Sequence, residues 1–458
     1  MDILITIAQF ILALSLLIVL HEGGHFFFAR LFKTRVEKFY LFFDFLFPFS
    51  NILPFSLWKK KKGDTEYGIG WFPLGGYVKI AGMVDESMDT GQMARPPQPW
   101  EFRSKKAWQR LLIMLGGIIV NVLLAFIIFA GILLAWGTEK LPMSEVNKNG
   151  GVVIMDSIGL KAGMKDGDQV LKIDQQPIRY FNNLDAEFIT ASTVQVIRDG
   201  KEQTIKLPVD LIGQLVDANR QSRIFSFNIP VIIGVVTKDS NAEKAGLKAK
   251  DIIRSVNGQA IPNLKDLHAL LRANKEKEVH LVIDRLGVPI TINVLVNKEG
   301  QLGFQMAAPE TKEDYALLGY SLEVQKYSIG EAIPAGVVMA GDKLRSYVKQ
   351  MKSIVNPETG GYKGLGGFVS MAKVYGGEWD WVRFWNITGT LSLILAFMNL
   401  LPIPGLDGGY VIFTLWEMVT GRKPNEKFLE VATTIGLVFL LVLMVYANVN
   451  DVVRNFFR

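Results

Sequence analysis

The sequence has 458 residues, enough for several domains, and no cysteine, which excludes disulfide bonds, thiolate nucleophiles and cysteine-ligated zinc. Its hydrophobic fraction of 49% and mean hydropathy of +0.24 are typical of a membrane protein with sizeable soluble parts. The net charge of +6 is modest, and no broad basic domain is present, so nucleic acid is not an expected partner.

The first apolar stretch, 3–29, is long enough to cross a bilayer. Asp2 stands where a signal peptide would be basic and no small-residue cleavage site follows, so we do not expect cleavage. Near the end of the stretch, His21, Glu22 and His25 form an H-E-x-x-H pattern. On a helix the two histidines share a face and can bind one Zn²⁺, with Glu22 as general base. Chance burial is disfavoured because each unpaired ionisable group costs about 2.5 kcal/mol or more in lipid.

The segment from Arg30 to Arg110 contains fourteen lysines and arginines, whereas no basic residue precedes Arg30. The positive-inside rule therefore predicts that this segment is cytoplasmic and that the N-terminus lies outside. Within it, 39–58 holds nine aromatic residues, and Lys59 to Lys62 follow directly. We expect 39–62 to lie at the inner membrane interface, with the lysines facing anionic lipid.

A second predicted span, 110–136, leads into a middle region that this topology places outside the membrane. Here 158–178 aligns with 241–261 at an offset of 83 residues, with identical pairs such as Asp168 and Asp251. The repeated pattern of a small-Gly turn, a polar turn ending in Asp and an alternating strand resembles the core of a PDZ domain. It implies two β-rich PDZ-like domains, 138–225 and 226–308. Such domains bind peptide ends along a strand edge; a steric cover over an active site is the alternative.

The remaining chain is predicted to return to the membrane. Residues 309–380 have amphipathic stretches, and we expect interfacial helices there, or alternatively a helical hairpin packed on the PDZ-like domains. Two further spans are predicted at 386–403 and 428–447, joined by a short basic loop on the inner side. The expected fold class is a polytopic α-helical membrane protein with about four transmembrane helices, a membrane-associated β-hairpin and two β-rich extracytoplasmic domains.

Catalytic zinc usually has three protein ligands, so a partner for the two histidines is needed. The other two histidines, His268 and His280, fall on the opposite side of the predicted membrane. A carboxylate is therefore expected, and Asp407 is the best candidate because it follows the inner end of the third span, where prolines and glycines break the helix. The alternative for Asp407 is a helix N-cap. Asp44 and Glu417 are weaker candidates for the ligand.

Three motifs, HEGGH at 21–25, NLLPIPGLDGG at 399–409 and GWFPLGGYVKIAGM at 70–83, resemble the site-2 protease family in its bacterial RseP type. The resemblance extends over the whole chain and implies an intramembrane zinc metalloprotease with tandem PDZ domains. It implies His21, His25 and Asp407 as zinc ligands and Glu22 as the catalytic base.

The same resemblance implies substrate-binding residues. Asn399 matches an asparagine implicated in holding the substrate backbone near the metal. Residues 67–79 match a β-hairpin loop that is thought to pair with an unwound substrate as an added strand, which makes Gly75, Gly76 and Tyr77 candidates. An exposed strand edge would supply partners for peptide groups that leave a helix, although an ordinary turn explains the sequence equally well. The second span lacks the proline of the family's Gly-Pro-x-x-Asn pattern, which leaves a local kink in question.

The expected function is zinc metalloendopeptidase activity (EC 3.4.24.-) on single-span membrane proteins, such as anti-sigma factors or remnant signal peptides. The enzyme would lie in the bacterial inner membrane with its active site toward the cytoplasm, and its partners would be transmembrane substrates and lipids. A non-catalytic scaffold that presents PDZ modules is the alternative. A zinc transporter is disfavoured because no chain of intramembrane carboxylates is present. No oligomeric state is indicated.

Overall fold

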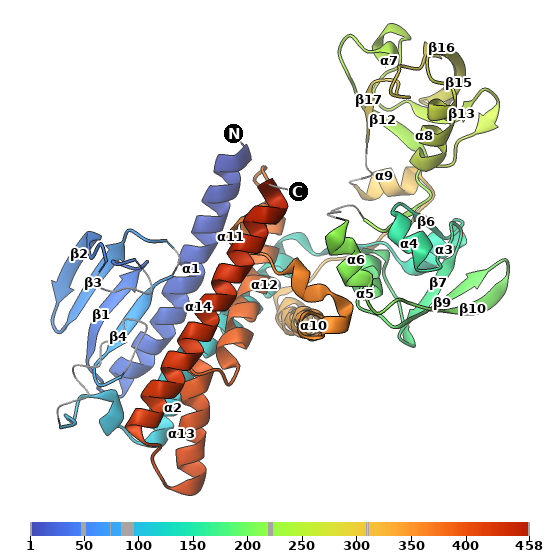
Figure 1. Ribbon diagram of the computed structural model, residues 1–458. Helices are drawn as coiled ribbons and strands as arrows, with labels where there is room; N and C mark the ends of the chain where they lie inside the picture. Colours follow the sequence, from blue (N-terminus) through green and yellow to red (C-terminus); the bar gives the residue numbers. More distant parts are fainter. Residues whose placement is uncertain are drawn as a thin grey trace. The chain divides into compact units, whose positions relative to one another are not determined.

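The structure is a computed structural model that describes residues 2–46, 52–73, 75–83, 96–218, 223–307, 309 and 311–456. The chain forms two compact units (Figure 1). The helical unit comprises Met1–Gly137, Lys326–Lys352 and Leu365–Arg458. The β-rich unit comprises Thr138–Gln325 and Ser353–Gly364.

The long helices of the helical unit are α1 (Asp2–Leu31), α2 (Ala107–Trp136), α10 (Ile329–Val355), α12 (Trp381–Leu400), α13 (Asp407–Thr420) and α14 (Glu426–Phe456). By length and composition, three helices of the described chain could cross a membrane: α1, α2 and residues Lys427–Arg454 of α14. The predicted span 386–403 falls on α12, which is not among them, so the count of four spans stays a prediction. The second span forms α2 as one continuous helix without the proline.

Helices α1 and α2 approach each other closely through glycine. A Cβ atom on Gly24 would lie 2.2 Å from the carbonyl oxygen of Gly116, and one on Gly116 would lie 2.5 Å from that of Gly24. Close backbone contact between small residues is how helices associate in lipid, where no hydrophobic driving force acts between them. The contact lies within the H-E-x-x-H motif and so brings α2 against both histidines.

A four-stranded sheet follows α1, and Figure 1 shows it packed beside that helix. Its strands are β1 (Val36–Leu41), β2 (Ser56–Lys62), β3 (Thr65–Gly70) and β4 (Tyr77–Ile80), in the order β2-β3-β1-β4. Strand β1 pairs parallel with β3 and antiparallel with β4. The expected hairpin over 67–79 is therefore wrong, because its two halves lie on opposite sides of β1; the hairpin that does form joins β2 to β3. Residues 47–51 of the aromatic stretch 39–62 lie outside the described residues.

The amphipathic region 309–380 divides between the units. Helix α10 (Ile329–Val355) packs on α2, with Gly336 against the backbone of Ala130, while apolar side chains such as Ile333 stay exposed. Helix α11 (Phe368–Lys373) is hydrogen-bonded to α14, because the Asp451 carboxylate accepts a 2.8 Å hydrogen bond from the Ser370 backbone amide.

Residues 309–325 differ from the expectation of interfacial helices. Helix α9 (Lys312–Leu317) is followed by Tyr320, which is buried in a core of the β-rich unit. Strand β18 (Glu323–Gln325) then pairs with β5 (Thr138–Lys140). This segment closes the β-rich unit because its aromatic side chains complete that core.

The β-rich unit contains two separate hydrophobic cores. The first lobe comprises α3 (Met143–Lys148), β6 (Val152–Ile154), α4 (Ser157–Lys161), β7 (Gln169–Ile173), β8 (Gln176–Pro177), α5 (Leu184–Phe188), β9 (Thr193–Arg198), β10 (Lys201–Lys206), α6 (Leu211–Asp217) and β11 (Phe225–Phe227). The second lobe comprises β12 (Val231–Val236), α7 (Asn241–Lys244), β13 (Ile252–Val256), β14 (Gln259–Ala260), α8 (Leu264–Ala273), β15 (Glu278–Arg285), β16 (Val288–Leu295) and β17 (Phe304–Met306). Strand orders are β10-β9-β7-β8 in the first and β16-β15-β13-β12-β17 in the second.

The internal repeat of the sequence is also a structural repeat. In the first lobe the Arg198 guanidinium donates two 2.7 Å hydrogen bonds to buried Asp168. In the second lobe Arg285 donates two 2.7 Å bonds to buried Asp251. In each lobe the arginine also donates to the carbonyl of the repeated glycine, Gly163 or Gly246.

Candidate metal centre

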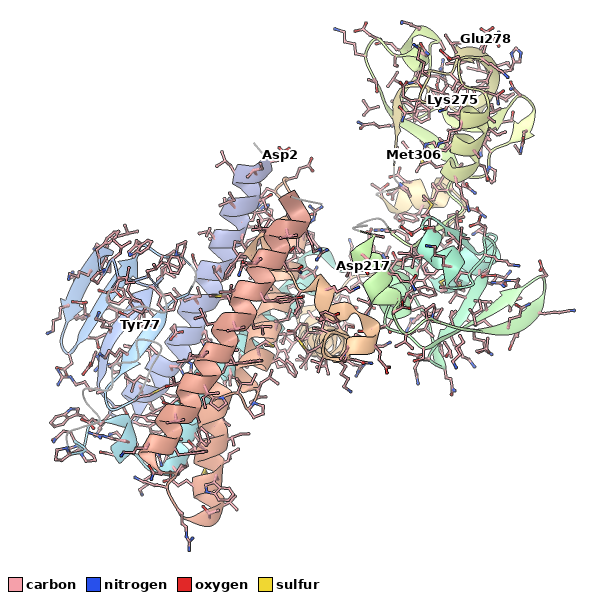
Figure 2. All side chains as sticks on the ribbon, in the orientation of Figure 1. Asp2, Tyr77, Asp217, Lys275, Glu278 and Met306 are labelled. Atoms are coloured by element: carbon pink, nitrogen blue, oxygen red, sulfur yellow. The ribbon has the colours of Figure 1, made fainter. Side chains whose placement is uncertain are left out.

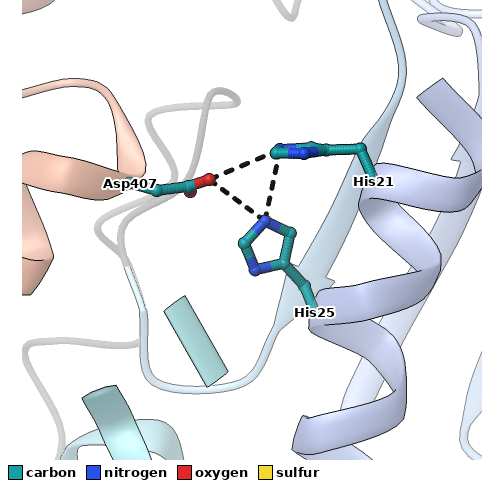
Figure 3. Close-up of side chains that lie close together, drawn as sticks. All are labelled: His21, His25 and Asp407. Atoms are coloured by element: carbon teal, nitrogen blue, oxygen red, sulfur yellow. Dashed lines mark hydrogen bonds and ion pairs between the residues drawn. The ribbon is translucent and has the colours of Figure 1, made fainter. Parts of the chain in front are cut away.

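Two histidines on α1 and one aspartate on α13 converge on a single point (Figure 3). The Nε2 atoms of His21 and His25 lie 3.4 Å apart, because an i, i+4 spacing places both rings on one face of the helix. One carboxylate oxygen of Asp407, Oδ2, lies 3.3 Å from each of these nitrogens. Both histidines are buried, and the group is the one potential metal site found among the described residues.

The break between α12 and α13 delivers Asp407 to this point. Helix α12 ends at Leu400 and the chain turns through two prolines to Gly405, whose φ of 98° suits glycine. Asp407 is the first residue of α13, and a Cβ on the following Gly408 would lie 2.1 Å from the carbonyl oxygen of Leu401. The capping alternative is wrong, since Leu406 occupies the N-cap and the Asp407 carboxylate faces the histidines.

The donor set fits a divalent cation. Asp407 Oδ2 is buried and accepts no hydrogen bond from the described residues. His25 Nδ1 lies 2.8 Å from the backbone carbonyl of Ile113, so in the neutral ring Nδ1–H donates and Nε2 keeps its lone pair. With His25 neutral, its Nε2 lone pair therefore faces Asp407 Oδ2 at 3.3 Å with no proton between them, and a bound cation removes that conflict. Two imidazoles and one carboxylate are the ligand types of catalytic zinc.

The other candidate ligands are engaged elsewhere. Asp44 accepts a 2.9 Å hydrogen bond from the Tyr77 hydroxyl, and Glu417 pairs with Arg110 at 2.5 Å. His268 and His280 belong to the second lobe of the β-rich unit, where His280 Nδ1 contacts Asn293 at 2.7 Å.

The remaining predicted site residues lie in two places. Asn399, near the end of α12, has its side-chain nitrogen 3.1 Å from His21 Nε2. Gly76 lies against α1, where a Cβ would come within 2.5 Å of Ile18, and a Cβ on Gly75 would meet the Phe43 ring. Tyr77, labelled in Figure 2, is only 2% exposed, so its side chain packs within the unit and is closed to solvent. Glu22 is half-buried on α1.

Sequence reasoning assigned no role to two α2 residues that touch the histidines. The side chain of Asn121 lies 3.0 Å from His21 Nδ1. A Cβ on Gly117 would lie 2.5 Å from His25 Nε2 and 2.6 Å from His21 Cε1. The sequence did contain a signal for Asn121, which is an amide side chain in the interior of an apolar span. Polar side chains inside a membrane usually have a polar partner. Gly117 stands four residues earlier, on the same face of the helix.

Comparison with known proteins bears directly on this site. Residues 9–443 match the model of peptidase family M50. The chain belongs to this family. Members of family M50, the site-2 proteases, are membrane-embedded zinc peptidases, so this protein is a zinc metalloprotease of the membrane.

Relatives of similar length carry the names of proteases. The Regulator of sigma-E protease RseP of Escherichia coli (strain K12) is 29% identical over 478 residues, covering 98% of each chain. A Putative zinc metalloprotease of Vibrio cholerae is 28% identical over 474 residues, covering 99% of each chain. Protease RseP of Yersinia pestis is 27% identical over 483 residues, covering 99% of this chain and 100% of that one. Each of these alignments covers 98% or more of the present chain.

Proposed function

We propose that this M50 protease hydrolyses a peptide bond within the transmembrane segment of a single-span membrane protein. The observation that carries the proposal is the convergence of His21, His25 and Asp407 beside helices that are apolar and long enough to cross a membrane. A hydrolytic centre within the membrane can act only on peptide bonds that also lie within the membrane. In lipid, those bonds belong to transmembrane helices.

We assign His21, His25 and Asp407 as the zinc ligands and Glu22 as the general base. When bound, Zn²⁺ supplies a Lewis acid for the scissile carbonyl and lowers the pKa of water at the site. Glu22 follows His21 directly and is half-buried, so it is positioned to take the proton of the attacking water and to deliver it to the leaving amine.

We assign the substrate-binding role to Asn399 and to the β4 side of the sheet, at Gly75, Gly76 and the backbone of Tyr77. A substrate helix must unwind before cleavage, and its freed peptide groups then need hydrogen-bond partners. Strand β4 ends the strand order β2-β3-β1-β4 among the described strands and lies beside α1, so its outer edge can accept an added strand.

We further assign the two lobes of the β-rich unit as PDZ-like domains, 138–225 and 226–308, on the outer face of a bacterial inner membrane. The active site then lies toward the cytoplasm. The lobes exclude substrates whose outer domains have not been trimmed, and binding of peptide ends is the second role. Anti-sigma factors are the first substrate class, in line with the name of the Escherichia coli relative, and remnant signal peptides are the second.

Substitution of Glu22 tests the proposal. In purified Glu22→Gln protein we expect zinc content to be retained, because Glu22 is no ligand. Cleavage of a transmembrane reporter should fall by about 10²- to 10⁴-fold, the usual contribution of a general base. Zinc is measured by elemental mass spectrometry, and Glu299→Gln, in an exposed turn of the second lobe, is the matched control.

The outcomes separate the rival functions. Equal turnover by wild type and Glu22→Gln rules out Glu22 as the base. Absence of both zinc and cleavage in the wild type favours the non-catalytic scaffold. Zinc uptake into sealed vesicles without reporter cleavage favours the transporter.

A further inference from the structure

Helix α2 touches both candidate histidine ligands through three residues spaced four apart, Ile113, Gly117 and Asn121. This spacing places the three residues on one face of the helix. The carbonyl of Ile113 contacts His25, and the side chain of Asn121 contacts His21. The earlier residue of α2 therefore contacts the later histidine of α1, as expected for two antiparallel helices. Gly117 lies between them, where an added Cβ would come within 2.7 Å of both rings.

Both contacts involve Nδ1, the imidazole nitrogen that faces away from the point of convergence. His25 Nδ1–H donates to Ile113, as any backbone carbonyl requires. At His21, the nitrogen proposed to bind zinc is Nε2, which lies 3.3 Å from Asp407 Oδ2 and needs its lone pair for the metal. A neutral His21 that binds the metal through Nε2 carries its proton on Nδ1, so the atom of Asn121 that faces Nδ1 must be an acceptor.

Asn121 can supply that acceptor without moving its backbone. Its Nδ2 lies 3.0 Å from His21 Nδ1, while its Oδ1 is buried without a hydrogen-bond partner among the described residues. The two ends of an amide have nearly the same shape, so a half-turn about the last side-chain bond places Oδ1 opposite Nδ1–H. Asn121 is fully buried, and its backbone carbonyl accepts a 2.8 Å hydrogen bond from the Ser392 hydroxyl of α12.

We propose that Asn121 is a positioning residue that holds His21 in the tautomer whose Nε2 binds the metal, and that Gly117 provides the space for both rings. The proposal rests on the assignment of His21 and His25 as zinc ligands. Partners of this kind, on the far nitrogen of a ligand histidine, set its tautomer and orientation and raise its basicity.

The test is zinc affinity of the purified full-length protein, measured by competition with a fluorescent chelator. Asn121→Leu keeps the volume but has no acceptor, and we expect its zinc affinity to fall by about 10- to 100-fold. Asn121→Asp keeps an acceptor and should restore binding to near the wild-type value. Ser392→Ala removes the hydrogen bond to the Asn121 backbone only and should bind zinc as the wild type does.

Gly117 is tested in the same assay. Gly117→Ala should lose zinc affinity because its methyl group would overlap both imidazoles. Gly131→Ala lies on the same helix with no atom within 4 Å of the new methyl group and should bind normally. Thermal unfolding of the zinc-free proteins identifies any variant that fails to fold.

Three results would overturn the proposal: wild-type affinity in folded Asn121→Leu, an equal loss in Asn121→Asp, or an equal loss in Ser392→Ala. The last would mean that packing around α2 rather than the His21 contact is responsible. His21→Ala separates this failure from failure of the proposed function. If that variant binds zinc normally, the ligand assignment itself is wrong.

Discussion

Asn399 is a predicted substrate-binding residue whose side chain lies next to the candidate metal centre. Its amide nitrogen lies 3.1 Å from His21 Nε2, the atom that points toward Asp407. An amide at this position can also reach the backbone of a peptide that enters the centre, because it offers both a donor and an acceptor. The sequence motif indicated the role, but only the fold shows the contact with His21.

Removal of the Asn399 amide should therefore affect turnover rather than metal content. For Asn399→Ala we expect kcat/KM on a transmembrane reporter to fall by about 10- to 100-fold, the cost of one hydrogen bond to a charged or polarised group. Zinc affinity should stay at the wild-type value. Asn386→Ala, on the same helix, is the control. Parallel loss of zinc and activity would instead make Asn399 part of the metal site.

At the scale of elements, the repeated aspartate–arginine pair joins a turn to a strand in each lobe. In the second lobe Asp251 is buried, and Arg285 holds it with two hydrogen bonds. Burial alone raises the pKa of Asp251, but the hydrogen bonds from Arg285 and from the Lys248 amide outweigh it and hold the pKa below its ordinary value. A carboxylate with a depressed folded-state pKa stabilises the fold above its unfolded pKa of about 3.9. That stability is lost as the pH falls through the folded-state pKa.

Arg285→Met should lower the local opening free energy of β15 by about 3 kcal/mol at pH 7, because it leaves a buried carboxylate unpaired. Hydrogen exchange of peptides from 278–295 measures the change in the full-length protein. Arg254→Met breaks a more exposed pair with Asp284 and should cost less than about 1 kcal/mol. As the pH falls below about 4, wild type and Arg285→Met should converge. Identical exchange at pH 7 would contradict the role of the pair.

Strand β2 presents a second testable element, since Leu57 and Trp58 are exposed and Lys59 to Lys62 follow them on the same edge strand. We predict that this strand lies on anionic lipid, with each lysine contributing about 1 kcal/mol. The chain has no cysteine, so Leu57→Cys can carry a single polarity-sensitive fluorophore. Its emission in nanodiscs with anionic lipid should move toward the value in water when the four lysines become glutamine. The control replaces Lys275 and Lys277 instead, and an equal shift there would contradict the prediction.

For the whole molecule, the distribution of basic residues predicts which side of the membrane each unit faces. Single cysteines can test this in the cysteine-free chain with a maleimide that does not cross membranes. In intact spheroplasts we expect labelling of Lys275→Cys, in the second lobe, and protection of Lys60→Cys, in β2. Both should react after permeabilisation. The reverse pattern would invert the topology and place the metal centre toward the outside.

Local pattern accounts for the parts of this fold that were predicted correctly. The apolar lengths anticipated α1, α2, α12 and α14, and the helical spacing of His21 and His25 anticipated their shared face. The 83-residue repeat anticipated matching turns and strands in the two lobes. The strand order β2-β3-β1-β4 was missed because parallel pairing of β1 with β3 depends on contacts that no local pattern encodes. The return of 309–325 to the first core was missed for the same reason.

The sequence by itself determined the chemistry of this protein: an H-E-x-x-H pattern on an apolar helix and a carboxylate after a broken helix. The tertiary structure decided which groups meet. It brought Asp407 to 3.3 Å from both histidines, excluded Asp44 and Glu417, and placed Gly117 and Asn121 against the imidazoles. The physical reason is that ligand types follow from residue identity, whereas distances between α1, α2 and α13 follow from helix packing across the whole unit.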